Sequence, residues 1–86
     1  MKQFIHTISD PLGIHARPAG LLAKAAKAYP DTEITVAKDG NSARATQLMK
    51  LMGMGIRQGD RVTVTLSGPD EEPAAESIRR FFEENL

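Results

Sequence analysis

The 86-residue chain contains no cysteine. Disulfides, thiolate metal sites and cysteine nucleophiles are therefore excluded, and the composition fits a reducing cytoplasm. The chain also lacks the run of about 18 or more apolar residues that a membrane-spanning helix needs. Its N-terminal segment, MKQFIHTISD, lacks the long apolar stretch of a secretion signal. We expect a cytoplasmic protein that does not insert into a membrane.

Neither sign of charge is in excess, because eleven Lys and Arg residues balance eleven Asp and Glu residues. This balance argues against a nucleic-acid partner. The distribution is uneven, since residues 15–27 carry three cations and no acid, whereas residues 70–84 carry six acids against two arginines. We infer a local anion site in the first segment and a solvated face in the second. Either segment alone is also compatible with an ordinary solvated helix face.

The length predicts one domain, residues 1–86. A chain of this size buries roughly 60% of its unfolded surface. There is no room for a deep, enclosed active site, so any chemistry must lie on a shallow surface or a loop.

Apolar residues recur with a period of two in four segments, which predicts four strands. The first covers residues 2–8, the second is centred on residues 34–36, and an Asp39-Gly40 hairpin leads to a short third strand. The fourth follows a turn at residues 58–60. The residues expected on the inner face are Phe4, His6, Ile8, Ile34, Val36, Ala43, Ala45, Val62, Val64 and Leu66.

Three further segments have a helical period. The first begins at Ala16 and is ended by Pro30, the second spans about Gln47 to Met52, and the third follows Asp70 as its N-cap. The residues expected to face inward are Ala19, Leu22, Ala23, Ala26, Tyr29, Leu48, Leu51, Ala74, Ala75, Ile78, Phe81 and Phe82. The order β-α-β-β-α-β-α predicts an α+β two-layer sandwich with the helices on one face of the sheet.

The segment Gly13-Ile14-His15-Ala16-Arg17-Pro18-Ala19 places a histidine at the start of a helix. The first N–H groups of a helix lack intrahelical partners, so the amides of Ala16 and Arg17 can bind an anion. The Arg17 guanidinium matches a phosphate, and neutral imidazole is a nucleophile. The pattern indicates that His15 is a surface nucleophile for phosphoryl transfer. The alternative is a histidine that only caps the helix or is hydrated.

Other kinds of site have less support. A metal site is not expected, because His6 lies on a predicted strand, half-buried, and no carboxylate cluster accompanies His15. A small phosphohydrolase would need a Gly-rich phosphate-binding loop, and the chain has no comparable segment. No cofactor is expected.

The segment from Gly13 to Ala19 resembles the complete active-site signature of the HPr family of histidine-containing phosphocarriers. The similarity extends to the Asp-Gly hairpin, the methionine-rich second helix that ends in Met54-Gly55-Ile56, the Gln58-Gly59 turn and the last helix. The resemblance implies an HPr-like open-faced β-sandwich, in which three helices cover one face of a four-stranded antiparallel sheet.

The resemblance also implies roles for residues. The histidine aligned with His15 accepts a phosphoryl group on Nδ1 from enzyme I of the bacterial phosphoenolpyruvate-dependent sugar phosphotransferase system. It then donates that group to an enzyme IIA component of a sugar permease. Arg17 would contact the phosphate, and the Ala16 amide would help to bind it. The chain would be a monomeric carrier that forms a phosphohistidine, with transferase chemistry only in the presence of these partners.

A docking surface for partners is implied on the first two helices. Exposed methionines adapt to partners of different shape, although Met49 or Met52 can also simply cover the edge of the core. The residues that map to this surface are Gly20, Lys24, Lys27, Met49, Lys50, Met52 and Gly53.

Kinase-linked regulation is in doubt. Many family members from low-GC Gram-positive bacteria carry a serine at the start of the second helix that an ATP-dependent kinase phosphorylates. Gln47 stands at that position here and cannot be phosphorylated, while the adjacent Thr46 could cap the helix or act as a shifted phosphosite. We expect His15 to be the only phosphorylation site of consequence. The alternative function is that of a paralogue that signals carbon or nitrogen status.

Overall fold

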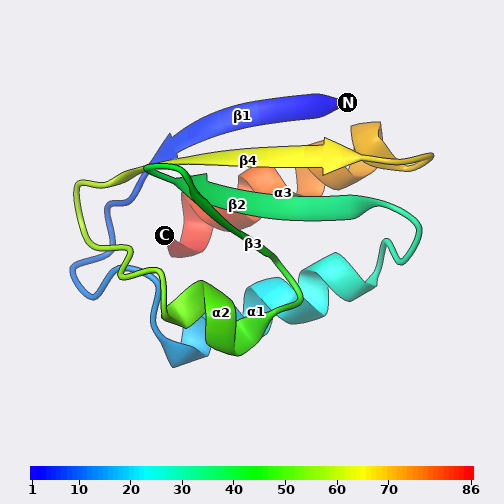
Figure 1. Cartoon of the computed structure of the whole chain (residues 1–86). Helices are drawn as coiled ribbons and strands as arrows, with labels where there is room; N and C mark the ends of the chain where they lie inside the picture. Colours follow the sequence, from blue (N-terminus) through cyan, green and yellow to red (C-terminus); the bar gives the residue numbers. More distant parts are fainter.

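The structure, a computed structural model, describes residues 1–86 and has the element order β-α-β-β-α-β-α (Figure 1). The strands are β1 (Lys2–Thr7), β2 (Glu33–Lys38), β3 (Asn41–Arg44) and β4 (Arg61–Ser67). The helices are α1 (Ala16–Lys27), α2 (Leu48–Met52) and α3 (Glu71–Asn85). Three helices on one face of a four-stranded antiparallel sheet confirm the predicted α+β open-faced sandwich.

The sheet has the strand order β1-β4-β2-β3, and every neighbouring pair is antiparallel. Phe4 lies opposite Val64, and Val64 lies opposite Val36. Because side chains alternate between the two faces of a strand, this register brings the predicted inner positions of the three strands onto one face, where the helices cover them.

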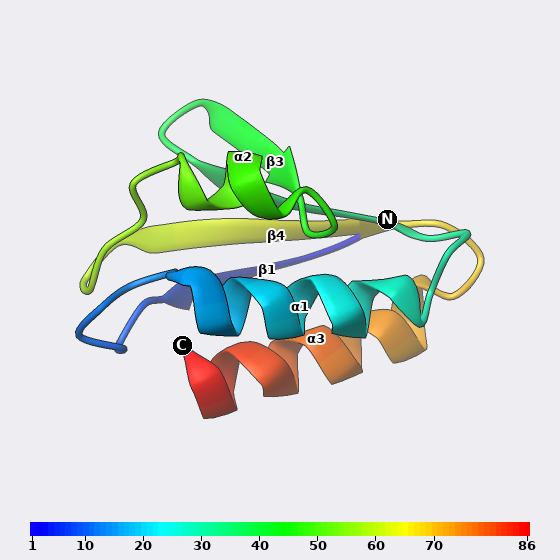
Figure 2. The same cartoon turned by 90° about the horizontal axis from the view of Figure 1, so that it is seen from below.

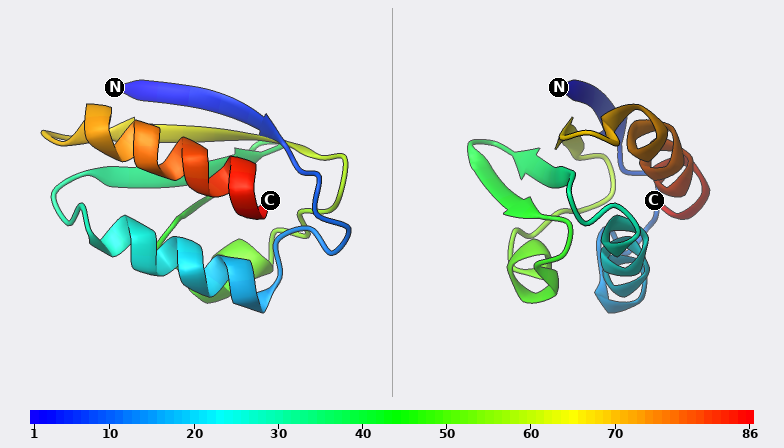
Figure 3. Two further views of the ribbon diagram at one scale, coloured as in Figure 1. Left: turned by 180° about the vertical axis from the view of Figure 1, so that it is seen from behind. Right: turned by 90° about the vertical axis from the view of Figure 1, so that its right-hand side faces the viewer.

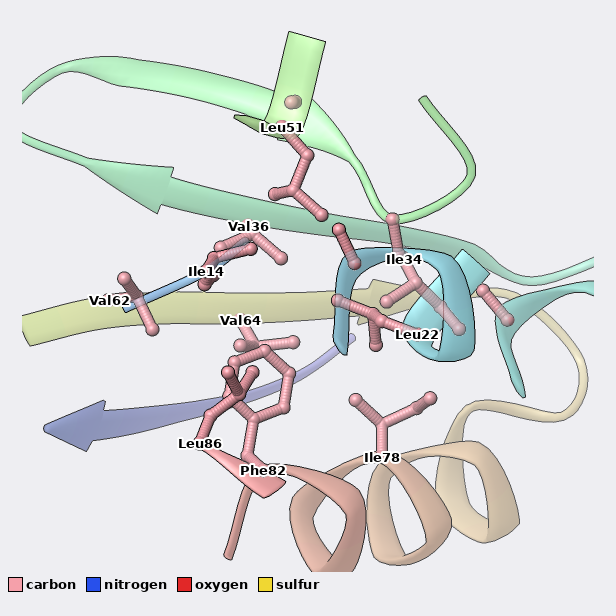
Figure 4. Close-up of a cluster of buried hydrophobic side chains, with 14 of the residues drawn as sticks. Ile14, Leu22, Ile34, Val36, Leu51, Val62, Val64, Ile78, Phe82 and Leu86 are labelled. Atoms are coloured by element: carbon pink, nitrogen blue, oxygen red, sulfur yellow. The ribbon is translucent and has the colours of Figure 1, made fainter. Parts of the chain in front are cut away.

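The core lies between that face and the helices, where 19 buried residues form one cluster. Figure 4 shows Leu22, Ile78 and Phe82 pointing from α1 and α3 toward the side chains of the sheet. In the end-on view of Figure 3, α1 lies between α2 and α3. Figure 2 shows that α1 and α3 run in opposite directions beside each other. None of the three helices is both long and apolar enough to span a membrane.

One detail of the predicted packing is wrong. Leu48 was expected to face inward but is 36% exposed, whereas Leu51 is fully buried. Since α2 has only five residues, little more than one turn, one position points straight at the core. Ala45 is buried as expected, although strand β3 ends one residue earlier, at Arg44.

Both predicted helix caps differ from expectation. Asp70 occupies the N-cap position of α3, but its side chain makes no capping hydrogen bond. Its backbone N–H instead donates to the hydroxyl oxygen of Thr32 over 3.1 Å, and Glu71 Oε1 accepts from the N–H of Gly68 over 3.4 Å. At α2 the N-cap position belongs to Gln47 and not to Thr46. At α3 these side-chain hydrogen bonds fix the segment that leads into the helix, and no side-chain hydrogen bond caps either helix.

Candidate functional site

His15 is the last residue before α1, at the N-cap position, with φ −110° and ψ −177°. Its carbonyl oxygen accepts the first helical hydrogen bond, from the N–H of Ala19 over 3.0 Å. Its side chain makes no capping hydrogen bond. The half-buried imidazole is therefore not engaged in capping the helix, so of the two alternatives, a capping and a hydrated histidine, only the second remains.

The surroundings of His15 favour an anion. The backbone N–H groups of Ala16 and Arg17 belong to the first turn, which has no intrahelical acceptors for them, and this turn contains no acidic residue. The positive end of the helix dipole adds to the same potential. The Arg17 side chain is exposed and forms no ion pair within the chain, so its guanidinium is available to an incoming ligand.

A shallow hollow of about 360 Å³ lies over these groups. The carboxylates of Asp10 and Glu84 also line this hollow. The Asp10 carboxylate already accepts a hydrogen bond from the Leu12 N–H over 2.8 Å. That bond closes the turn that leads to His15. The residues that line the hollow are Asp10, His15, Arg17, Pro18, Leu21, Glu84 and Asn85.

The turn before His15 requires glycine. Gly13 has φ +66°, and a Cβ atom there would lie 2.2 Å from the carbonyl oxygen of Ile56 and 2.8 Å from Cα of Arg57. The next residue, Ile14, donates its N–H to the same carbonyl oxygen over 3.2 Å and is itself buried in the core. His15 is thus delivered to the surface directly from a residue that is fixed in the core.

The residue that follows α3, Leu86, contacts the same turn, and this contact was not predicted. The carbonyl oxygen of Leu86 accepts hydrogen bonds from the backbone N–H groups of Ser9 and Asp10 and from the Ser9 hydroxyl. Leu86 is 2% exposed and follows Phe82 by four residues. The helical period of the last segment could have indicated this burial, because it extends the stripe of Ile78 and Phe82 by one more turn.

The residues that were predicted to form a docking surface lie on α1 and α2, which are neighbours (Figures 1 and 2). Met49 is 79% exposed and Met52 36% exposed, so Met49 does not cover the core. Lys24, Lys27, Lys50 and Gly53 are exposed as well, and Gly20 is half-buried. Leu21, 45% exposed, and Leu48, 36% exposed, add apolar area beyond the predicted surface.

The start of α2 contains a glutamine with a structural contact. Gln47 Oε1 accepts from the N–H of Arg44 over 3.0 Å, and the Gln47 N–H donates to the carbonyl oxygen of Arg44 over 2.9 Å. Thr46 is exposed and lines a hollow of about 470 Å³ together with Lys27 and Arg44.

His6 is not part of this constellation. It lies on β1 opposite Val62, and its ring packs edge-on against Phe82 with 5.4 Å between the ring centroids. It is half-buried, as predicted, and its contacts are those of a residue at the border of the core.

An ion pair between the end of β2 and the segment before β4 was also not predicted. Lys38 Nζ lies 2.7 Å from Asp60 Oδ2 and donates to the carbonyl oxygen of Gly55 over 3.2 Å. Asp60 Oδ2 also accepts from the Arg57 N–H over 2.8 Å. The hydrogen bonds from Lys38 and from the Arg57 amide lower the pKa of Asp60 from its usual 3.8. Lys38 and Asp60 are far apart in the sequence, so no local pattern indicates the pair.

The chain is similar to known proteins in both sequence and fold. Residues 2–84 match the family model described as PTS HPr component phosphorylation site. The chain is 40% identical over 85 residues to the phosphocarrier protein HPr of Mycoplasma genitalium, covering 99% of this chain and 97% of the relative. It is 42% identical over 66 residues to that of Vibrio cholerae, covering 77% and 76%. The crystal structure of HPr-C-His from Thermoanaerobacter tengcongensis matches with a TM-score of 0.90 at 33% identity, covering 98% of this chain and 93% of that chain.

Proposed function

The chain belongs to the HPr family, and from that premise we propose that it is a phosphocarrier of the phosphoenolpyruvate-dependent sugar phosphotransferase system. It accepts a phosphoryl group on His15 from phospho-enzyme I and donates the group to enzyme IIA components of sugar permeases. The observation that supports this best is the uncapped His15 imidazole at the start of α1, beside an Arg17 side chain without an ion-pair partner.

The chemistry follows from these groups. The Nδ1 lone pair of neutral His15 attacks phosphorus, and the new N–P bond forms while the bond from phosphorus to the donor breaks. The N–H groups of Ala16 and Arg17 and the Arg17 guanidinium then lie beside the phosphoryl oxygens. Preorganised donors of this kind stabilise the charge on the transferring group in both directions of transfer.

The hollow over His15 is shallow and open. The partners must therefore exclude water from it and align the reacting atoms. The cations Lys24, Lys27 and Lys50 would meet acidic partner surfaces, and Met49 and Met52 would supply adaptable apolar contact. Gly20 and Gly53 would allow close approach. In this proposal residues 1–86 act as one cytoplasmic, monomeric domain, and Gln47 leaves the start of α2 without a phosphosite.

The test is to incubate the protein with phosphoenolpyruvate and enzyme I and to search by mass spectrometry for an acid-labile adduct of about 80 Da. We expect one adduct on the wild type, none on His15→Ala, and an unchanged adduct on the control His6→Gln. Subsequent addition of an enzyme IIA domain should remove the label. Labelling of His15→Ala would show that the proposal is wrong.

A further inference from the structure

Residues 55–60, which we call the buttress loop, bind both ends of the segment that carries His15. Figures 1 and 3 show the two segments beside each other at one end of the sheet. Before the turn, the Gly59 N–H donates to the carbonyl oxygen of Ile8 over 2.8 Å. The Ile8 N–H in turn donates to the carbonyl oxygen of Asp60, also over 2.8 Å. Gln58 Nε2 donates to the carbonyl oxygen of Ser9 over 3.1 Å.

The buttress loop also contacts the residues after the turn. The Ile14 N–H donates to the Ile56 carbonyl oxygen. The same oxygen occupies the space that a Cβ atom on Gly13 would need. A displacement of Ile56 must therefore move Gly13 and Ile14, the two residues that precede His15. Packed interiors transmit such displacements because they contain few voids.

The buttress loop is itself fixed by one side chain from outside it, that of Lys38. The Lys38 ammonium group, at the end of β2, reaches both the Asp60 carboxylate and the Gly55 carbonyl oxygen, and so joins the two ends of the loop. Its side chain is 21% exposed and that of Asp60 28%, whereas the Arg80–Glu76 pair on α3 is 65% and 77% exposed. Partly buried pairs are less screened by solvent than exposed ones, so the Lys38–Asp60 pair constrains its surroundings more strongly.

We propose that Lys38 and Asp60 are positioning residues for phosphoryl transfer: they fix the buttress loop, which through Ile56 sets the orientation of His15 at the start of α1. Neither residue contacts the hollow over His15. The inference rests on the proposed function for the reaction that it affects, whereas the constraint on the loop can be measured without that reaction.

The experiment compares Lys38→Met and Asp60→Asn with Lys38→Arg, which keeps the charge, and with Arg80→Met, which breaks an ion pair on α3. Initial rates of phosphorylation by enzyme I give kcat and KM for each variant, and amide hydrogen exchange is followed at Ile14 and Arg57. Lys38→Met and Asp60→Asn should lower kcat by about three- to tenfold, with KM changed by less than about twofold. The loss stays in this range because Leu86 still binds Ser9 and Asp10.

Exchange of the Ile14 N–H should be several-fold faster in the same two variants, while Lys38→Arg and Arg80→Met should behave like the wild type in both measurements. Wild-type kcat and wild-type Ile14 exchange in Lys38→Met would overturn the inference, as would equal losses in Arg80→Met. If the wild type takes no phosphoryl group, the proposed function fails instead. Ile14 exchange then still decides whether the pair constrains the loop.

Discussion

The carbonyl oxygen of Ile56 lies 2.2 Å from the point that a Cβ atom on Gly13 would occupy. Gly13 also has φ +66°, in the left-handed region that residues with a Cβ atom disfavour. Two separate requirements, a backbone conformation and a close approach, therefore coincide two residues before His15. They can be separated by experiment, because other glycines in the chain meet only the first.

Gly13→Ala should destabilise the protein more than the matched variant Gly55→Ala. Gly55 has φ +68°, but a Cβ atom there would meet nothing within 4 Å, so alanine adds only backbone strain, about 1 kcal/mol. At Gly13 the carbonyl group of Ile56 must also move away from the new methyl group. We therefore expect a total loss of about 2–4 kcal/mol in the free energy of unfolding. Urea unfolding of both variants measures the difference. Equal losses would show that the close approach is unimportant.

Gly20→Ala should raise stability and slow docking. Gly20 lies inside α1, and a Cβ atom there would have no neighbour within 4 Å, so the fold does not require glycine. Alanine should stabilise the helix by about 0.5–1 kcal/mol. If a partner approaches this face closely, the added methyl group should raise KM for enzyme I while kcat stays near wild type. Thermal unfolding and initial rates measure the two effects, and an unchanged KM would remove Gly20 from the docking surface.

The sequence predicted the sheet well because burial imposes a period of two. The inner positions Phe4, Val36 and Val64 were all identified from alternation alone, and they meet in register. His15 was predicted as the site residue for a similar reason, since the conditions for an anion site at a helix start are local. A glycine, a histidine, two free amides and an arginine within a few residues indicated it, and the resemblance to the HPr family favoured phosphoryl transfer over a capping or hydrated histidine.

Contacts between distant segments were not predictable in the same way. The hydrogen bonds of Leu86 with Ser9, and of Lys38 with Asp60 and Gly55, join parts of the chain that only the folded topology brings together. Leu48 shows a different limit, because periodicity in a helix of five residues does not define one inward direction. Asp70 shows a third, since it occupies the N-cap position without forming the capping hydrogen bond, while the side chains of Thr32 and Glu71 bind the segment before α3.

Arg17→Ala should leave the fold intact and slow phosphoryl transfer. The side chain is exposed and forms no ion pair, so we expect a change of less than about 0.5 kcal/mol in the free energy of unfolding. Loss of a charged donor beside the transferring group should reduce kcat by about 10- to 100-fold. Arg17→Lys keeps the charge without the planar fork and should recover part of the rate. Equal rates for wild type and Arg17→Ala would exclude Arg17 from the site.

The pH dependence of stability should reveal the contacts of Asp60. Hydrogen bonds from Lys38 and from the Arg57 N–H lower its pKa in the folded protein, with smaller contributions from the charges of Lys38 and Arg57. Because the folded pKa lies below the unfolded one, the stabilisation is fully present above the unfolded value, near 3.8, and is lost as pH falls through the folded pKa. Urea unfolding of wild type and Asp60→Asn should therefore differ by a constant amount from neutral pH down to about pH 5, and the two should converge at lower pH. In a Lys38→Met background the difference should be smaller and should depend less on pH, since the main cause of the lowered pKa is gone. A difference between wild type and Asp60→Asn that persists undiminished in strong acid would contradict the assignment, because a protonated Asp60 can no longer pair with Lys38.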